Sequence, residues 1–220
     1  MDHFEITCRE NEWRIEGFPN AVKVIRITGP KGRRLADLAL HKADLDFALE
    51  CLAAINHQPG DSYVTRQAFW RSAIVHFMKC FGRNVSRFSL DAKKVYKSDD
   101  DADEAFAFFS SLRSKHVVHD ENSYAQCLPG AVLNKDGSDC KIAKIVCLGV
   151  IGDTLCQGTY NNLHLLSTRA REWVAAQFDE LCAIVTAELE SKAYDDLLAE
   201  DGMNYTPPAA SDMHTGRPVF

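Results

Sequence analysis

Residues 67–83 read QAFWRSAIVHFMKCFGR, and this stretch decides the fold because its large apolar side chains recur at the spacing of an α-helix. The expected helix covers 63–81, and its apolar side consists of Phe69, Ile74, Phe77 and Phe81. Gly82 follows at a position where helices commonly end on glycine. The pattern predicts an amphipathic helix that buries one face in a helical core.

The neighbouring segments continue the helical pattern on both sides. The stretch DLDFALECLAAI predicts a helix that starts at about Asp44. Downstream, Ser89 and Asp91 are start signals for a short helix through Tyr96. The acidic run KSDDDADE then favours a helix N-terminus through the helix dipole. It leads into EAFAFFSSLRSKHVVHD, whose apolar side is expected to contain Phe106, Phe109 and Leu112.

The outer segments carry weaker signals. Residues 3–28 alternate in the manner of three short strands, FEITC, EWRIEGF and AVKVIRI, and GPKGRR after them is expected to be a loop. Pro129 and Gly130 break the pattern before a hairpin with Asp136-Gly137 in its turn. A long helix is expected last, and the proline-containing tail that follows it shows almost no periodicity.

These segments predict a mainly α fold with minor β structure, of the α+β class. We expect a single domain over 1–200 and a flexible tail over 201–220. Within that domain we expect N-terminal strands and a loop (1–40), core helices (41–125), a hairpin (131–160) and a long C-terminal helix (166–199).

Composition excludes several classes of protein. No apolar run approaches the roughly 20 residues that a membrane-spanning helix needs. The N-terminus, MDHFEITCRENEW, is polar where a signal peptide is apolar, so we expect a cytoplasmic protein without a membrane association. The net charge of −6 argues against a general nucleic-acid coat, because such proteins are usually basic, but it permits one local basic site.

Eight cysteines raise the question of disulfides or a metal centre. None form a C-x-x-C pair, and most lie in apolar runs, such as Cys51 in ALECLAAI and Cys147 in KIVCLGVI. Free cysteine packs as a small buried hydrophobe, and a reducing cytoplasm permits this. We therefore expect structural free thiols, with a metal or redox role as the alternative.

The two central helices together resemble a HEPN domain over roughly residues 40–125. The resemblance rests on the long helix QAFWRSAIVHFMKCFGR, the short polar helix after it, and a helix that ends SLRSKHVVHDENSY. Members of that family carry an R-x(4–6)-H motif, which matches Arg113 and His119 here. Ser114 departs from the asparagine that most often follows the arginine. The numbers of arginines and histidines alone predict roughly one chance match to this loose spacing. Arg71 with His76 is a further match in the sequence.

The resemblance implies a helical bundle that pairs into a homodimer, and in active members a metal-independent endoribonuclease of a toxin or phage-defence kind. Such an enzyme cleaves RNA with the substrate's own 2′-hydroxyl, and an antitoxin or another protein is a further expected partner. His119 would act as acid or base near neutral pH, and Arg113 would stabilise charge on the phosphate. The expected helpers are Ser114, Lys115, His116 and Asp120. No cofactor and no metal are expected.

Helix geometry and simpler explanations leave alternatives open. On a straight α-helix the side chains of Arg113 and His119 point about 120° apart, so one site needs a distorted helix end or a second copy of the chain. Arg113 could instead bond to Asp120, and His119 could be a histidine favoured by the helix dipole. His116, His119 and Asp120 also form a weak metal-ligand pattern. The alternative function is a catalytically silent HEPN-like binding or scaffold module.

Overall fold

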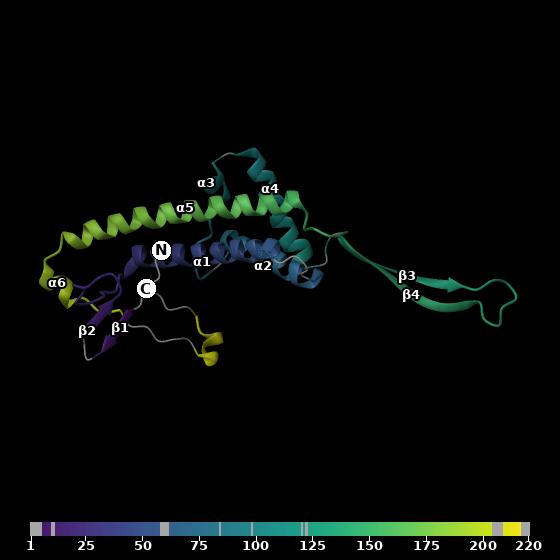
Figure 1. Ribbon diagram of the computed structural model, residues 1–220, viewed down its shortest axis with the longest axis horizontal. Coiled ribbons are helices and arrows are strands. Elements are labelled where there is room, and N and C mark those ends of the chain that lie inside the picture. Colours follow the sequence, from purple (N-terminus) through teal and green to yellow (C-terminus); the bar gives the residue numbers. More distant parts are fainter. Residues whose placement is uncertain are drawn as a thin grey trace. The chain divides into compact units, whose positions relative to one another are not determined.

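A computed structural model describes residues 6–9, 12–57, 62–83, 85–97, 99–119, 121, 123–203 and 209–216. It is mainly helical, with a two-stranded antiparallel hairpin before a long final helix, which confirms the expected α+β class (Figure 1). In chain order the elements are β1 (Ile6–Arg9), β2 (Glu12–Ile15), α1 (Gly29–His57), α2 (Tyr63–Phe81), α3 (Ala92–Tyr96), α4 (Asp100–Leu112), the π-helical turn η1 (Arg113–Val117), β3 (Ala125–Leu133), β4 (Ile142–Ile151), α5 (Gln157–Glu190), α6 (Tyr194–Ala199) and the 3-10 turn η2 (Ala210–His214).

The chain divides into two compact units. The first contains residues 1–43, 83–89 and 171–220, and the second contains residues 44–82 and 90–170. The single domain expected over 1–200 stays a prediction, because this division runs through the continuous helices α1 and α5 rather than through a linker.

The second unit has an aromatic core built by α2 and α4. Trp70, Phe77 and Phe109 are fully buried, and the ring centroids of Trp70 and Phe109 lie 6.0 Å apart in an edge-on arrangement. The indole of Trp70 donates a hydrogen bond to the hydroxyl of Thr154 at 2.9 Å, so its one polar atom is satisfied. This core holds α4, and therefore the start of the predicted catalytic segment.

Polar contacts join α3 and the start of α4 to α5 within the same unit. The Tyr96 hydroxyl donates to the carbonyl of Leu166 at 3.2 Å, and burial raises the pKa of Tyr96. Asp99 caps α4 by accepting from the amide of Ala102, and it pairs with Arg169 at 2.5 Å. The expected capping signals are confirmed for α3, because the Asp91 side chain accepts from the amide of Lys93.

The first unit is organised around Phe88. The guanidinium carbon of Arg34 lies 3.4 Å from the centre of the Phe88 ring, and the ring of His41 contacts it edge-on. Asp37 accepts a hydrogen bond from the amide of Phe88, and Leu38 is buried beside these residues on α1. The N-terminal part of α1 is thus fixed by contacts with a residue far away in the sequence.

These contacts explain two errors in the sequence prediction. The segment GPKGRR was expected to be a loop and the helix to start at about Asp44, but α1 starts at Gly29. Pro30 suits the first turn of a helix, and Phe88 supplies the packing that the local sequence does not reveal. The predicted strand over 21–27 is also wrong. Its extended backbone forms one isolated bridge, between Ile25 and Gly202.

The boundaries of the hairpin and of the last helix are also corrected. The hairpin does not cover 131–160, because β3 contains Pro129 and Gly130 and β4 ends at Ile151. A proline is tolerated on the edge strand of a two-stranded ribbon, where one N–H faces solvent. The predicted turn is confirmed, and Gly137 has a φ of +81°.

The predicted helix over 166–199 is two helices, α5 and α6, and α5 starts at Gln157. The hydroxyl of Thr159 accepts a hydrogen bond from the amide of Cys156, which satisfies one of the free N–H groups at this helix start. In the predicted flexible tail, Gly202 bridges to Ile25 and 210–214 form a 3-10 turn, while 204–208 and 217–220 lie outside the described residues.

The structure describes the side chains of seven of the eight cysteines, and that of Cys8 lies outside this described part. The expected burial is correct for two of the seven and wrong for four. Cys51 and Cys80 are buried free thiols. Cys182 is half-buried, and Cys127, Cys140, Cys147 and Cys156 are exposed. The apolar run around Cys147 belongs to β4, which is exposed along almost its whole length. Across the described ranges, no helix is both long and apolar enough to cross a bilayer.

Candidate functional site

The segment that carries the predicted motif is a distorted helix end. At Arg113 the helix α4 passes into the π-helical turn η1, in which the amide of Val118 donates to the carbonyl of Arg113 at 3.1 Å. The amide of Glu121 donates to the carbonyl of Lys115 at 2.9 Å, so this hydrogen bond also spans more residues than an α-helical one. π turns inside α-helices are rare and are frequent at functional sites. The distortion that a shared Arg113–His119 site requires is therefore present.

Ser114 explains part of this distortion. Its hydroxyl donates to the carbonyl of Ser110 at 2.9 Å and lies 3.3 Å from the carbonyl of Ser111. Serine side chains that bond back to the preceding turn often bend a helix. In this conformation the Ser114 hydroxyl is engaged by its own helix, and its role as a helper stays a prediction.

Arg113, Lys115 and His119 are all exposed. Within the described part of the chain, the side chain of Arg113 takes part in no ion pair, and no hydrogen bond joins it to His119. Asp120, the predicted helper and the alternative partner of Arg113, lies outside the described residues. The structure thus leaves the cation and the imidazole open to solvent but does not bring them into contact.

His116 has a different environment from the other predicted helpers. It is half-buried, and its ring lies 5.7 Å from the ring of Tyr124 at the base of the β3–β4 hairpin. Its Nδ1 atom is buried without a hydrogen-bond partner among the residues that the structure describes. Gly152 makes this packing possible, because a Cβ atom there would lie 2.6 Å from the Tyr124 ring. His116 therefore connects η1 to the hairpin.

The second match to the motif is part of a polar cluster that the sequence did not reveal. His76 Nδ1 lies 2.8 Å from Asp44 Oδ1, and Lys79 Nζ lies 3.0 Å from the same oxygen. Asp44 is 8% exposed, and the Phe47 ring lies 4.4 Å from the His76 ring. A carboxylate on Nδ1 fixes the orientation of an imidazole and leaves Nε2 for proton transfer. The same contacts also tie α1 to α2, which is their simplest role.

The exposed thiol of Cys156 has an altered acidity. Cys156 precedes the first turn of α5, and hydrogen bonds from the hydroxyl and amide of Thr159 lower the pKa of the Cys156 thiol. Thiolates are favoured at helix N-termini for the same reason, since free N–H groups point at the sulfur. Among the described residues no group of three His, Cys, Asp or Glu side chains lies close enough together to hold a metal ion.

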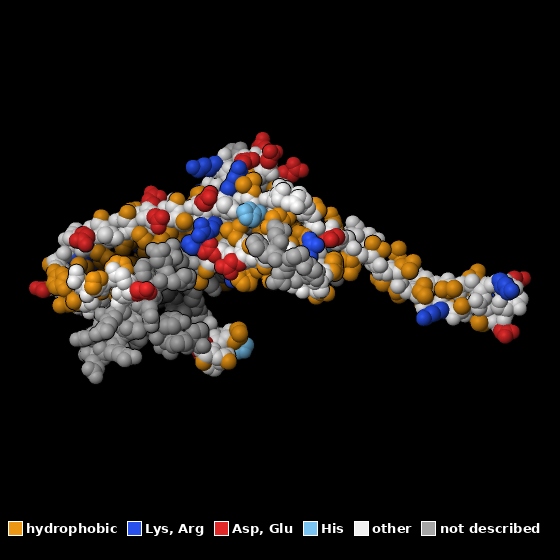
Figure 2. Space-filling model, in the orientation of Figure 1, with side chains coloured by type: hydrophobic (Ala, Val, Ile, Leu, Met, Phe, Trp, Pro, Cys, Tyr) orange, Lys and Arg blue, Asp and Glu red, His pale blue; other side chains and the backbone are white. Residues whose placement is uncertain are grey.

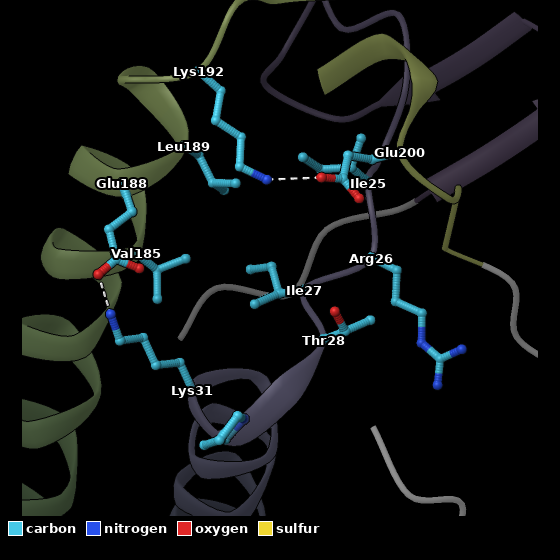
Figure 3. Close-up of a pocket in the computed structure, with 11 residues that line it drawn as sticks. Ile25, Arg26, Ile27, Thr28, Lys31, Val185, Glu188, Leu189, Lys192 and Glu200 are labelled. Carbon is cyan, nitrogen blue, oxygen red and sulfur yellow. Dashed lines mark hydrogen bonds and ion pairs between the residues drawn. The ribbon is translucent and has the colours of Figure 1, made fainter. Parts of the chain in front are cut away.

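A pocket of about 360 Å³ lies in the first unit (Figure 3). Its lining residues are far from Arg113 and His119 in the sequence. Ion pairs between Lys31 and Glu188 and between Lys192 and Glu200 lie at its rim, the second at 2.7 Å. These pairs satisfy four of the five charged side chains that line the pocket, and Arg26 is the fifth, so the lining is mixed apolar and polar. Its other lining residues are Ile25, Arg26, Ile27, Thr28, Pro30, Val185 and Leu189.

No family model matches the chain, and no curated protein or solved structure matches it either. The resemblance to HEPN domains therefore rests on the residues of this chain alone.

Proposed function

We propose that the protein is a HEPN-like homodimer that acts as a metal-independent endoribonuclease in a toxin or phage-defence role. The observation that carries the proposal is the exposure of Arg113 and His119 at a π-helical helix end. A structural arginine would be expected to have a carboxylate partner, and the described residues contain none for Arg113. The cation is therefore open to a phosphate.

The chemistry follows from the two side chains. The 2′-oxygen of a ribose attacks the adjacent phosphorus, a new O–P bond forms, and the bond to the 5′-oxygen breaks. His119 accepts the proton of the 2′-hydroxyl or donates one to the departing 5′-oxygen, for which an imidazole is suited near neutral pH. Arg113 stabilises the charge on the phosphoryl oxygens. DNA lacks the 2′-hydroxyl and is expected to be inert.

The proposal needs two copies of the chain. No hydrogen bond joins Arg113 to His119, and one motif supplies a single histidine for two proton transfers. Two copies facing each other would border one cleft with both motifs, and Lys115 would add a cation at its edge. Lys115 is exposed, as this role requires.

A catalytically silent HEPN-like binding or scaffold module is the second candidate. The net charge of −6 favours it, because an RNA-binding surface would have to be local in an acidic protein. The hydrogen bonds of Ser114 to its own helix favour it as well, since the family's usual asparagine is replaced by a side chain that is already engaged.

The test is RNA cleavage by the purified protein in the presence of EDTA. The wild type is compared with Arg113→Ala/His119→Ala and with Arg71→Ala, which removes an exposed arginine from another match to the motif spacing. We expect wild type and Arg71→Ala to cleave total RNA or tRNA and the double variant to lose activity. Absence of cleavage by all three proteins would support the silent module instead.

A further inference from the structure

The two strands of the hairpin, which we call the β-arm (residues 125–133 and 142–151), are exposed although they are apolar. Figure 1 shows the β-arm extending away from α4 and from the start of α5, and Figure 2 shows hydrophobic side chains along it. Val146 is half-buried, and eight other large aliphatic side chains of the β-arm are 44–72% exposed: Leu128, Val132, Leu133, Ile142, Ile145, Leu148, Val150 and Ile151. Single exposed hydrophobics are normal, but a contiguous set of this size marks an interaction site.

Both faces of the β-arm are apolar. In the observed register Leu128 lies opposite Leu148 on one face, and Ala131 lies opposite Ile145 on the other. Lys144 is the one charged residue within the two strands. A sheet with one face in water would alternate apolar and polar residues along each strand. Strands without that alternation are typical of a sheet that is covered on both sides.

The β-arm also has a free edge that suits pairing. The described residues place β3 and β4 in a two-stranded sheet, so each strand has one outer edge. β3 contains Pro129, which lacks an N–H, whereas β4 has no proline. An isolated two-stranded hairpin is marginally stable in water, and a further strand on an edge adds backbone hydrogen bonds. The edge of β4 is the better template for such a strand.

We propose that the β-arm joins two copies of this chain through antiparallel pairing of their β4 edges around a two-fold axis at Cys147. The two strands contain 9 and 10 residues, which is just below the about 20–30 residues a side of a standard interface. Two-fold homodimers are the commonest oligomers, and an edge that pairs with itself provides the self-complementary surface they need.

Charge at the two ends of the β-arm supports this register. When Cys147 lies opposite itself, Lys141 lies opposite Asp153 of the partner subunit, because both are six positions from the centre. Both side chains are exposed, and the opposite charges favour the pair. Asp153 Oδ1 also accepts hydrogen bonds from Gln67 Nε2 at 3.0 Å and from the amide of Leu155 at 2.9 Å, which hold the carboxylate at the base of the β-arm. A nucleic acid is a poor occupant, since Lys144 is the single cation within the two strands and the lysines of the connecting turn lie beside Asp136 and Asp139.

The inference does not depend on the proposed ribonuclease. Antiparallel pairing centred on Cys147 places the bases of the two β-arms, and the η1 turns beside them, at opposite ends of the paired strands. This contact is therefore not the face-to-face pairing of motifs that the ribonuclease needs, and a dimer formed through helices would be unaffected by changes in the β-arm. Failure of RNA cleavage and failure of the β-arm contact are therefore separate results.

The main test is the mass of the full chain in solution, measured by sedimentation. Ile145→Lys/Leu148→Lys places one charge on each face of the β-arm, and Val64→Lys/Val85→Lys is the control at two exposed valines elsewhere. We expect wild type and control to be dimers and the β-arm variant to be a monomer with unchanged circular dichroism. A monomeric wild type, or a β-arm variant that remains dimeric, would overturn the proposal, as would a monomer that binds phosphatidylcholine vesicles through the arm.

A second test addresses the register. Mild oxidation should link the two copies through Cys147, and Cys147→Ser should lose the covalent dimer while Cys140→Ser keeps it. Lys141→Asp should weaken the dimer, and Lys141→Asp/Asp153→Lys should restore it. A covalent dimer that persists in Cys147→Ser would contradict the two-fold axis proposed here.

Discussion

The helix α2 and the β-arm are both rich in large apolar residues, but the structure buries one and exposes the other. Trp70, Ile74 and Phe77 of α2 are fully buried, whereas Leu148 and Ile151 of the β-arm are mostly exposed. In α2 the apolar residues occur at helical spacing and share a face with a ready partner in α4. In the β-arm they occupy both faces and lie exposed among the described residues of their own unit. Apolar sequence thus indicates that a segment will be covered, without indicating by what.

The sharpest test of this difference is truncation of one side chain in each region. Phe77→Ala should lower the free energy of unfolding by roughly 3–5 kcal/mol, because it empties a buried aromatic site. Leu148→Ala should change it by less than about 0.5 kcal/mol when the chain is monomeric, because its side chain is mostly in water already. Urea unfolding at low protein concentration measures both. Equal losses would show that the β-arm is covered within the monomer.

A smaller effect is expected from the polar contact between α3 and α5. Tyr96→Phe removes the hydrogen bond to the carbonyl of Leu166 and should lower the free energy of unfolding by about 1 kcal/mol. Tyr194→Phe is the matched control, because Tyr194 is 65% exposed. Identical unfolding curves for the two variants would mean that the apolar contacts alone hold α3.

The ion pair of Asp99 should make the helical region more sensitive to acid than the β-arm. The hydrogen bond from Arg169, followed by that from the amide of Ala102, lowers the pKa of Asp99 below its ordinary value. Its contribution to stability is therefore present above the unfolded pKa of about 3.9 and is lost as the pH falls through the lower folded pKa.

Asp99→Asn should destabilise the protein at neutral pH, and the difference from wild type should vanish in acid. Asp136→Asn at the tip of the β-arm should have no effect at either pH, and thermal unfolding across the pH range measures both. A difference that persists below the folded pKa would show that the carboxylate charge is not the cause.

The smallest expected effect is a difference in thiol reactivity. Cys156 should be alkylated faster than Cys147 of the β-arm near neutral pH, because hydrogen bonds from Thr159 lower the pKa of the Cys156 thiol. Thr159→Val should slow the reaction of Cys156 and leave Cys147 unchanged. Iodoacetamide labelling followed by mass spectrometry gives both rates. Faster labelling of Cys51 than of either thiol would contradict the burial described above.

The elements that sequence predicts well are those with local signals at both ends. The helix α2 was expected over 63–81, and its N-cap Ser62 and C-cap Gly82 lie at those ends. The start of α1 failed because GPKGRR carries turn residues, while the contacts that make it helical come from Phe88. The strand expected over 21–27 failed because alternation does not specify a partner strand.

The candidate site shows the same limit. Arg113 and His119 could be found because a motif places them in one short segment, but the π turn beneath them depends on bonds such as that of Ser114 to Ser110. The pair of Asp44 and His76 could not be found, because the two residues are 32 positions apart and meet only when α1 packs on α2. Neither the composition of the two segments nor the spacing of their apolar residues predicts this contact.

The π turn of η1 also decides how the direction of His119 would respond to a change in chain length. A π turn accommodates one residue more than an α turn between its bonded groups, so removing one residue from 113–117 would let the helix continue in α form. Because the π turn absorbs this additional residue, the side chains beyond the deletion would keep roughly their present directions, whereas a deletion in a regular α turn would rotate them by about 100° around the helix axis. The turn at 113–117 is therefore a point at which the chain could lose one residue while keeping the direction of His119 and the entry into the β-arm.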